Sequence, residues 1–450
     1  MFTRSTRRLR VAGIAAIAAA SMVLTACGGA SSASSSDASG SQPADGAPSG
    51  SITVLTWRTD LVEDGTFDTY KQEFQAKYPD VDVEFEGITD YEGEVRTRMN
   101  TDDYGDVLAI PATVTPDQFP HFFEPLGDLA ELKTQYRWLD DKSYQGKSYG
   151  IPVNGNVNGV VYNKRVWDEA GITELPTTPE QFLTDLATIK QSSADVTPLY
   201  TNYKDGWPLT KWEDFRGGIT ADADYVNEMT QTDEPWTAGT DHYVIDSLLY
   251  DAVSQKLTED DPTSTNWELS KTKMGDGTVA AMMLGSWAIP QMQKAAQEAG
   301  HDAADIGYMP FPAQVDGKFH AMTGGDYNLA INVHSQNKPA ARAWIDWFNH
   351  ESGYSESQEG LSPLIDGPVP ATLKDFEATG VQYLTLNPAP AGKESLLGDI
   401  DKAAEIGLTS PDYRQKIIDA ARTGSQSAQA IFDDLNARWA QGRAKIESGS

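Results

Sequence analysis

Aromatic and polar side chains follow several of the apolar runs in this 450-residue chain. Trp57, Arg58 and Asp60 come directly after the run SITVLT, and Trp287 comes directly after TVAAMMLGS. An indole ring offers a flat apolar face, while arginine, asparagine and aspartate can make paired hydrogen bonds to neighbouring hydroxyl groups. These residue types together favour the binding of a hydroxylated ring, by stacking and hydrogen bonding, over chemistry on it.

Three more stretches carry residues of the same kinds. Asn156 lies in NGNVNG, Trp207 lies in TNYKDGWPLTKW, and Gly325 and Asp326 end TGGD just before the run YNLAINV. In open α/β sheets, ligands bind beyond the carboxyl ends of the strands. We therefore expect all these residues to face one ligand site.

The sequence carries no motif of a familiar catalytic centre. There is no His-Glu-x-x-His zinc pattern, no Gly-x-Ser-x-Gly elbow and no phosphate-binding loop. The six histidines are scattered, and Cys27 is the only cysteine. A glycosidase would need two carboxylates facing each other across a cleft, and nothing in the sequence points to such a pair. We expect no enzyme activity, no metal and no cofactor.

The first part of the body alternates strand-like and helix-like segments. Apolar strands are predicted at 51–57, 81–85 and 106–110, with helices at 67–78 and 90–102 between them. This order is typical of a parallel sheet covered by helices.

A second block repeats the alternation. Strands are predicted at 159–163, 278–284 and 327–333, and helices at 177–190, 287–300 and 337–350. Thr178 and Ser286 are each placed to cap the helix that follows. The indoles expected to serve as core are Trp138, Trp167, Trp344 and Trp347.

The N-terminal sequence is typical of an export signal. Residues 1–26 combine four arginines with an apolar stretch that is too short to cross a bilayer, and LTAC at 24–27 is similar to a bacterial lipobox. Cys27 is the predicted lipidation site. The pair Arg7-Arg8 is also compatible with twin-arginine export, so the sequence does not decide between that route and the Sec route. Residues 27–50 are rich in serine, glycine and alanine and form a tether, spanning about 26 Å for a flexible coil of this length.

The formal net charge is −31. Such an acidic protein repels nucleic acid and anionic lipid surfaces, which argues against both as partners. The mature chain exceeds what one hydrophobic core usually holds, so two domains are expected.

Three segments resemble the extracellular solute-binding proteins of ABC importers, in the carbohydrate-uptake group that includes maltose-binding proteins. They are GIPVNGNVNGVVYNKRVWDEAGI at 150–172, DGTVAAMMLGSWAIPQ at 276–291, and GGDYNLAINVHSQNKPAARAWIDWF at 324–348. Their order and spacing carry the resemblance over nearly all of the mature chain.

The resemblance implies an α/β, two-lobed periplasmic-binding-protein-like fold of type II, with the ligand cleft between lobes joined by crossing strands. Lobe 1 is expected at 51–157 and 327–375, and lobe 2 at 158–326 and 376–450. By position, Trp287 corresponds to the family's ring-stacking aromatic, and Asn156 to a polar contact at the hinge.

The resemblance also implies a function. The protein is expected to be a monomer, lipid-anchored at Cys27 on the outer face of the cell membrane, that captures a sugar and delivers it to ABC permease subunits. Because Arg58 is a cation that could bind an anionic group, a sugar acid or glycerol phosphate is also a candidate ligand. A secreted glycoside-active enzyme, and a sensor subunit or adhesin, remain as other classes.

Overall fold

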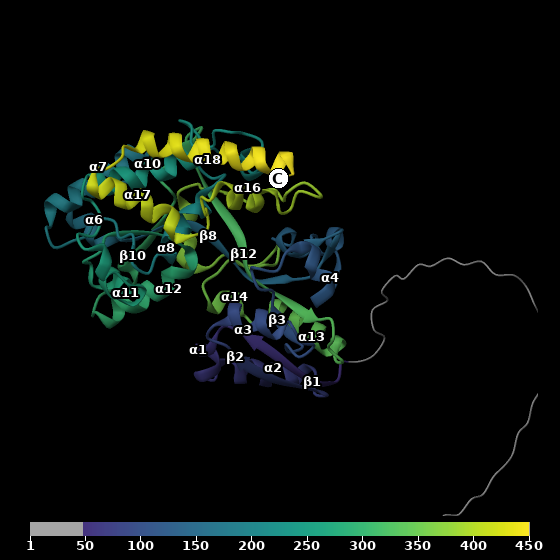
Figure 1. Cartoon of the computed structure of the whole chain (residues 1–450). Coiled ribbons are helices and arrows are strands. Elements are labelled where there is room, and N and C mark those ends of the chain that lie inside the picture. The colour runs from purple at the N-terminus through teal and green to yellow at the C-terminus, as the bar shows by residue number, and fades with distance from the viewer. Residues whose placement is uncertain (1–47, 450) are drawn as a thin grey trace, which may run out of the picture. The chain divides into compact units, whose positions relative to one another are not determined.

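Two long strands, β8 (Ile151–Asn163) and β12 (Lys318–Asn332), run between two α/β lobes in a computed structural model that describes residues 48–449 (Figure 1). They are antiparallel neighbours, from Ile151 opposite Leu329 to Val157 opposite Thr323. Both belong to a sheet with the strand order β10 (Ile306–Met309), β8, β12, β3 (Val107–Ala109), β1 (Gly50–Thr56) and β2 (Val81–Gly87). The expected two-lobed α/β architecture is therefore present.

The first lobe is built on the predicted β-α-β-α-β order. β1 (Gly50–Thr56) pairs in parallel with β2 (Val81–Gly87) and with β3 (Val107–Ala109), and β12 pairs antiparallel with β3. The helices of this part are α1 (Thr59–Glu63), α2 (Thr66–Lys77), α3 (Tyr91–Arg98), α4 (Phe119–Phe122), α5 (Leu129–Leu132), α13 (Lys338–His350) and α14 (Tyr354–Ser357). Trp344 and Trp347 of α13 are buried against this sheet, as predicted.

In the second lobe, the far half of β8 pairs antiparallel with β9 (Ala281–Gly285) and β10 (Ile306–Met309). Thr178 caps the predicted helix by accepting a hydrogen bond from Gln181 N, and Trp167 is buried as expected. The helices around these strands are α6 (Lys164–Glu169), α7 (Pro179–Ser192), α8 (Trp207–Thr210), α9 (Tyr225–Met229), α10 (Asp241–Ser254), α11 (Trp267–Asp276) and α12 (Ile289–Glu298).

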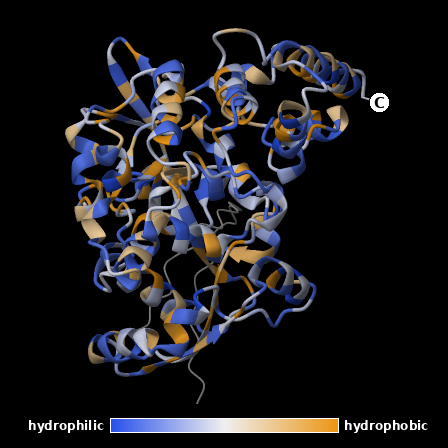
Figure 2. Ribbon diagram, turned by 90° about the vertical axis from the view of Figure 1, so that its left-hand side faces the viewer, coloured by the Kyte–Doolittle hydropathy of each residue, from blue (hydrophilic) through white to orange (hydrophobic). Residues whose placement is uncertain are grey.

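The chain ends in three helices that pack on the second lobe, α16 (Leu396–Ala404), α17 (Pro411–Thr423) and α18 (Ala428–Ser448). Their apolar residues meet Trp236 and Met229 in a shared core, and Figure 2 shows hydrophobic and hydrophilic residues alternating along the helix that ends at the C-terminus. The remaining short elements are β4 (Phe123–Glu124), β5 (Gly127–Asp128), β6 (Ser143–Tyr144), β7 (Lys147–Ser148), β11 (Gln314–Val315), β13 (Gln382–Leu384) and α15 (Lys374–Ala378). No helix within residues 48–449 is both long and apolar enough to cross a membrane.

The crossing strands pass under Trp138. Gly155 of β8 lies opposite Gly325 of β12, and a Cβ atom on Gly155 would come within 2.1 Å of the Trp138 ring. The indole Nε1 of Trp138 donates to Thr323 Oγ1 at 3.3 Å, which ties the ring to the same strand pair. Trp138 was expected to be core; it is partly buried, packs against a cluster of core residues and lies across the strands that join the lobes.

Replacing Gly155 with alanine should therefore destabilise the protein by about 1–3 kcal/mol, because the methyl group has no room beneath Trp138. Gly324, one residue from Gly325, provides the matched control, since a Cβ there meets nothing within 4 Å. Urea unfolding of the two alanine variants measures the difference. Equal stability of the two variants would contradict the close packing of Trp138 on Gly155.

Candidate ligand-binding cleft

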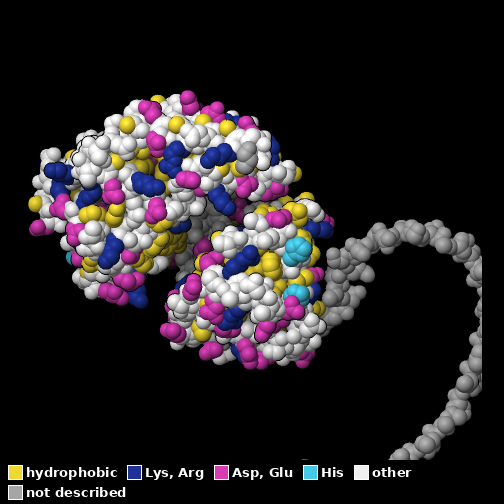
Figure 3. Space-filling model, in the orientation of Figure 1, with side chains coloured by type: hydrophobic (Ala, Val, Ile, Leu, Met, Phe, Trp, Pro, Cys, Tyr) yellow, Lys and Arg dark blue, Asp and Glu magenta, His cyan; other side chains and the backbone are white. Residues whose placement is uncertain are grey.

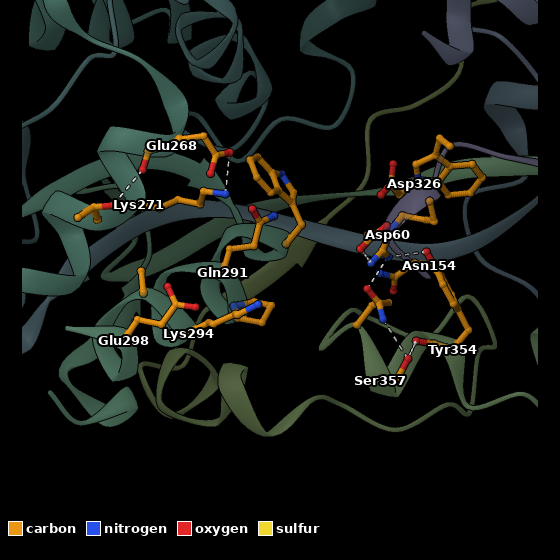
Figure 4. A pocket seen from close by; sticks show the side chains of 17 residues that line it. Asp60, Asn154, Glu268, Lys271, Gln291, Lys294, Glu298, Asp326, Tyr354 and Ser357 are labelled. Atoms are coloured by element: carbon orange, nitrogen blue, oxygen red, sulfur yellow. Dashed lines mark hydrogen bonds and ion pairs between the residues drawn. The ribbon is translucent and has the colours of Figure 1, made fainter. Parts of the chain in front are cut away.

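A cleft lies between the two lobes (Figure 3). It consists of two adjoining compartments. The first has a volume of about 730 Å³ and lies between the end of β1 with α14 on one side and α11 with α12 on the other (Figure 4). The second has a volume of about 760 Å³ and extends along β8 and β12 toward η3 (Lys211–Phe215). Each volume is typical of a small-molecule pocket. Trp287 and Asp326 line both compartments.

Trp287 lies where the sequence placed it, at the carboxyl end of the buried strand β9. A single 3-10 turn, Ser286–Ala288, carries it into α12. Its ring folds over Gly285, where a Cβ atom would come within 2.5 Å of the indole nitrogen. Because it is only partly buried and borders both compartments, Trp287 presents indole surface to the cleft.

Ser286 does not cap the helix, which corrects the prediction. It lies inside the 3-10 turn, and its Oγ accepts a hydrogen bond from Val157 N at 3.2 Å. The hydroxyl therefore links the Trp287 turn to the crossing strand β8. α12 itself begins without a side-chain cap.

Trp207 is brought next to Trp287 but is not among the residues that line either compartment. Its ring centroid is 5.7 Å from that of Trp287 and 5.1 Å from that of Trp267, which in turn lies 5.6 Å from Trp287. Trp207 and Trp267 thus both pack against the Trp287 ring. Trp207 therefore packs beside the cleft, and its direct contact with a ligand stays a prediction.

Trp57 lines the first compartment, but one of its faces is already covered. It stacks on Tyr327 with ring centroids 3.9 Å apart and an interplanar angle of 18°, and Tyr91 meets it edge-on. Tyr327 adopts a positive φ of 25°, a strained conformation for a non-glycine residue that persists only where the surroundings enforce it. This stack fixes the position of Trp57 on the wall of lobe 1.

Arg58 and Asp60 line the same compartment and bind each other. Nε and Nη2 of Arg58 donate to the two carboxylate oxygens of Asp60 at 2.9 and 2.7 Å. Arg58 Nη1 also donates to Tyr354 OH at 3.2 Å and to Gln358. The guanidinium is therefore paired and hydrogen-bonded within lobe 1 without any ligand.

Asn156, Gly325 and Asp326 converge in the second compartment, on the paired strands β8 and β12. Burial raises the pKa of Asp326, and a hydrogen bond from the Asn156 amide partly opposes the rise. Neighbouring Asn154 is buried, and its Oδ1 accepts hydrogen bonds from Gly155 N and Ser355 Oγ.

This burial gives the stability a pH dependence. Because the pKa of Asp326 is higher in the folded protein than in the unfolded chain, ionisation of this carboxyl lowers the free energy of unfolding. This loss of stability is absent below about pH 4 and develops as the pH rises through the folded-state pKa. Asp326→Asn should therefore gain stability relative to wild type as the pH increases from 4 to 8. Urea unfolding across this range tests it, with exposed Asp103→Asn as control; parallel curves for wild type and Asp326→Asn would contradict it.

Residues 58–353 match the family model described as Bacterial extracellular solute-binding protein. The chain belongs to this family. A structure of the ABC-transporter binding protein BlMnBP1 from Bifidobacterium animalis, in complex with mannobiose, is 34% identical with a TM-score of 0.79 and covers 88% of this chain and 95% of that one. The manno-oligosaccharide-specific BlMnBP2 from the same organism, in complex with mannotriose, is 33% identical with a TM-score of 0.80 and has the same coverage.

A third relative is the diacetylchitobiose-binding protein DasA of Streptomyces coelicolor. It is 28% identical over 386 residues, which cover 79% of this chain and 81% of that protein. The cleft described above is therefore that of a solute-binding protein. Cys27 and the predicted signal segment lie outside the described residues.

Several cleft residues of this solute-binding protein were missed from the sequence. Gln291 lies four positions after Trp287, and helical spacing from the indole could have revealed it. Tyr354 and Gln358 reach Arg58 across about 300 positions, and no local signal marks such contacts. The other lining residues not predicted include Asn154, Lys271, Lys294, Trp138, Asn158, Lys211, Asp214, Arg216 and Asn328.

Proposed function

We propose that this solute-binding protein captures a sugar, a mono- or oligosaccharide, between its lobes and delivers it to the permease subunits of an ABC importer. The observation that carries the proposal is the half-buried Trp287, held by Trp207 and Trp267 on the wall common to both compartments. A supported indole at this place suits the apolar face of a sugar ring. Asn156 and Asp326 beside it suit ring hydroxyls.

The relatives support the same ligand class. Three of them are described with mannobiose, mannotriose or diacetylchitobiose, and two of these exceed 30% identity over most of the chain. Arg58 was the reason to keep an anionic ligand open, but its charge is already matched by Asp60. That pairing favours a neutral sugar over a sugar acid or glycerol phosphate.

We further propose binding without chemistry. Contacts from both lobes form together only when the lobes close, so a sugar shifts the protein toward the closed form. The proposed lobes are 51–157 with 327–375, and 158–326 with 376–450. The protein is proposed to act as a monomer, lipid-anchored at Cys27 outside the cell membrane.

The test is calorimetric titration with a broad sugar panel, alongside a peptide, a polyamine and a phosphate ester. Saturable sugar binding, with the sugar recovered unchanged after long incubation, is the expected result. Binding of only a non-sugar solute would refute sugar capture, and recovery of cleaved sugar would favour the enzyme alternative.

A further inference from the structure

A short 3-10 segment, η3, forms part of the lobe-2 wall of the second compartment. η3 and the residue after it supply Lys211, Asp214 and Arg216 to the lining. Asn158 of β8 holds this segment at one point, because its Nδ2 donates to the Asp214 carbonyl at 3.0 Å. The second anchor is Glu213, which lies between the lining residues in sequence and is itself buried.

The Glu213 carboxylate is bound on both of its oxygens. Arg414 of α17 donates from Nη2 to Oε2 at 2.8 Å. Oε1 lies 3.0 Å from His242 Nε2 of α10 and 3.2 Å from Arg216 Nη1. Because these charge-assisted contacts hold the carboxylate at both ends, the oxygen that pairs with Arg216 is fixed in one position.

His242 is held in one orientation. It is fully buried in the first turn of α10, and its Nδ1 lies 2.8 Å from Tyr225 OH. The same hydroxyl accepts a hydrogen bond from His242 N at 3.2 Å, so its own proton is available for Nδ1. An ionised carboxylate only accepts hydrogen bonds, so Nε2 donates to Glu213. The imidazole is therefore held between Tyr225 and Glu213.

Asp241, next to His242, fixes the backbone just after Arg216. Its Oδ1 accepts a hydrogen bond from Thr220 N at 3.0 Å, and its Oδ2 accepts one from Gly217 N. Gly217 has a positive φ of 84°, a conformation that favours glycine. The backbone after Arg216 is thus held independently of Glu213, which leaves the Arg216 side chain as the part that Glu213 and His242 orient.

We infer that His242 is a positioning residue for the ligand, because it orients the Arg216 guanidinium through Glu213. The inference rests on the proposed function and adds to it a residue that lines neither compartment. The Arg216 side chain is 16% exposed and lines the second compartment, where guanidinium donors suit sugar hydroxyls. Without the His242 contact, the carboxylate turns toward Arg414, and the pair with Arg216, the longest of the three contacts, is lost first.

The test compares two substitutions of His242. The glutamine amide of His242→Gln can donate from nearly the place of Nε2, whereas the shorter side chain of His242→Asn does not reach Glu213. His242→Asn is expected to weaken mannotriose binding about fivefold, and His242→Gln less than about twofold, in calorimetric titration. If the unaltered chain does not bind mannotriose, the tightest-binding sugar of the panel replaces it.

A double-mutant cycle separates positioning from a general loss of packing. In an Arg216→Gln chain, His242→Asn should weaken binding by less than about twofold, because the guanidinium that it orients is absent. Tyr413→Phe is the matched control, since Tyr413 is buried in the same network but binds Asp246 instead of Glu213. This control should lower the melting temperature and leave the affinity within about twofold of the unaltered chain.

Equal losses in His242→Asn and His242→Gln would overturn the inference and leave the proposed function intact. So would unchanged affinity in His242→Asn or in Arg216→Gln, or an undiminished effect of His242→Asn in the Arg216→Gln chain. If no sugar of the panel binds the unaltered chain, the proposed function fails as well. If His242→Asn does not fold, Tyr225→Phe replaces it in the cycle with the same expectation, because it removes the hydroxyl that holds the imidazole.

Discussion

Replacing Trp287 with alanine should weaken binding of the proposed sugar about 30-fold or more, corresponding to at least about 2 kcal/mol. The reason is that the indole borders both compartments and is supported from behind, so its loss removes a rigid stacking surface from the centre of the cleft. Calorimetric titration of the variant measures the change.

A second variant separates the loss of sugar affinity from the loss of packing in the tryptophan cluster. Trp287 contacts Trp207 and Trp267, so its replacement also loosens the tryptophan cluster and lowers the stability of the unliganded protein. Trp267→Ala disrupts the same cluster without removing a cleft-lining ring, and should lose similar stability but less affinity. If both variants lost affinity equally, Trp287 would be part of the packing and not the ligand platform.

Replacing Arg414 with methionine should lower the free energy of unfolding by about 3–5 kcal/mol. Arg414 is 1% exposed and binds two buried carboxylates, Glu213 at 2.8 Å and Asp246 at 3.1 Å. Burial alone would raise the pKa of Glu213, but His242, Arg216 and Arg414 hold it well below its usual value. Removing Arg414 takes away the cation that both buried acidic side chains bind.

Urea unfolding measures this loss, and Lys416→Met is the matched control. Lys416 lies on the same helix and is exposed, so removing its charge should change stability by no more than about 0.5 kcal/mol. Combining Arg414→Met with Asp246→Asn should restore part of the stability, because Glu213 still binds Arg216 and His242 while the acidic partner that Arg414 alone neutralised is gone. A small effect of Arg414→Met alone would contradict the account of the network.

Local patterns predicted the position of Trp287 and, within a few residues, most boundaries of the strands and helices that were expected from the sequence. The apolar run 278–284 and the glycine-serine turn after it predicted a strand that ends at the cleft. β9 ends at Gly285, which is the first residue of that turn. The strands that join the lobes were predicted too short, as 159–163 and 327–333. Their missing halves contain NGNVNG and TGGD, whose polar residues face the cleft and so lack the apolar pattern of a strand.

The remaining cleft residues depend on contacts between distant parts of the chain. No local pattern showed that Arg58 is already hydrogen-bonded, because Tyr354 and Gln358 are far away from it in the sequence. Arg216 and Asn328 gave no signal, since their place in the lining of the second compartment depends on the fold and not on a local pattern. Such groups emerge only once the fold shows what surrounds them.

Closure of the two lobes around a sugar is the central claim, and a distance across the cleft tests it most directly. Spin labels at Glu63→Cys on α1 and Gln297→Cys on α12, both exposed, report the separation of the lobes in a chain whose Cys27 is replaced by alanine. Pulsed electron resonance should show one shorter distance after saturation with the tightest-binding sugar. An unchanged distance distribution at full saturation would contradict capture by closure.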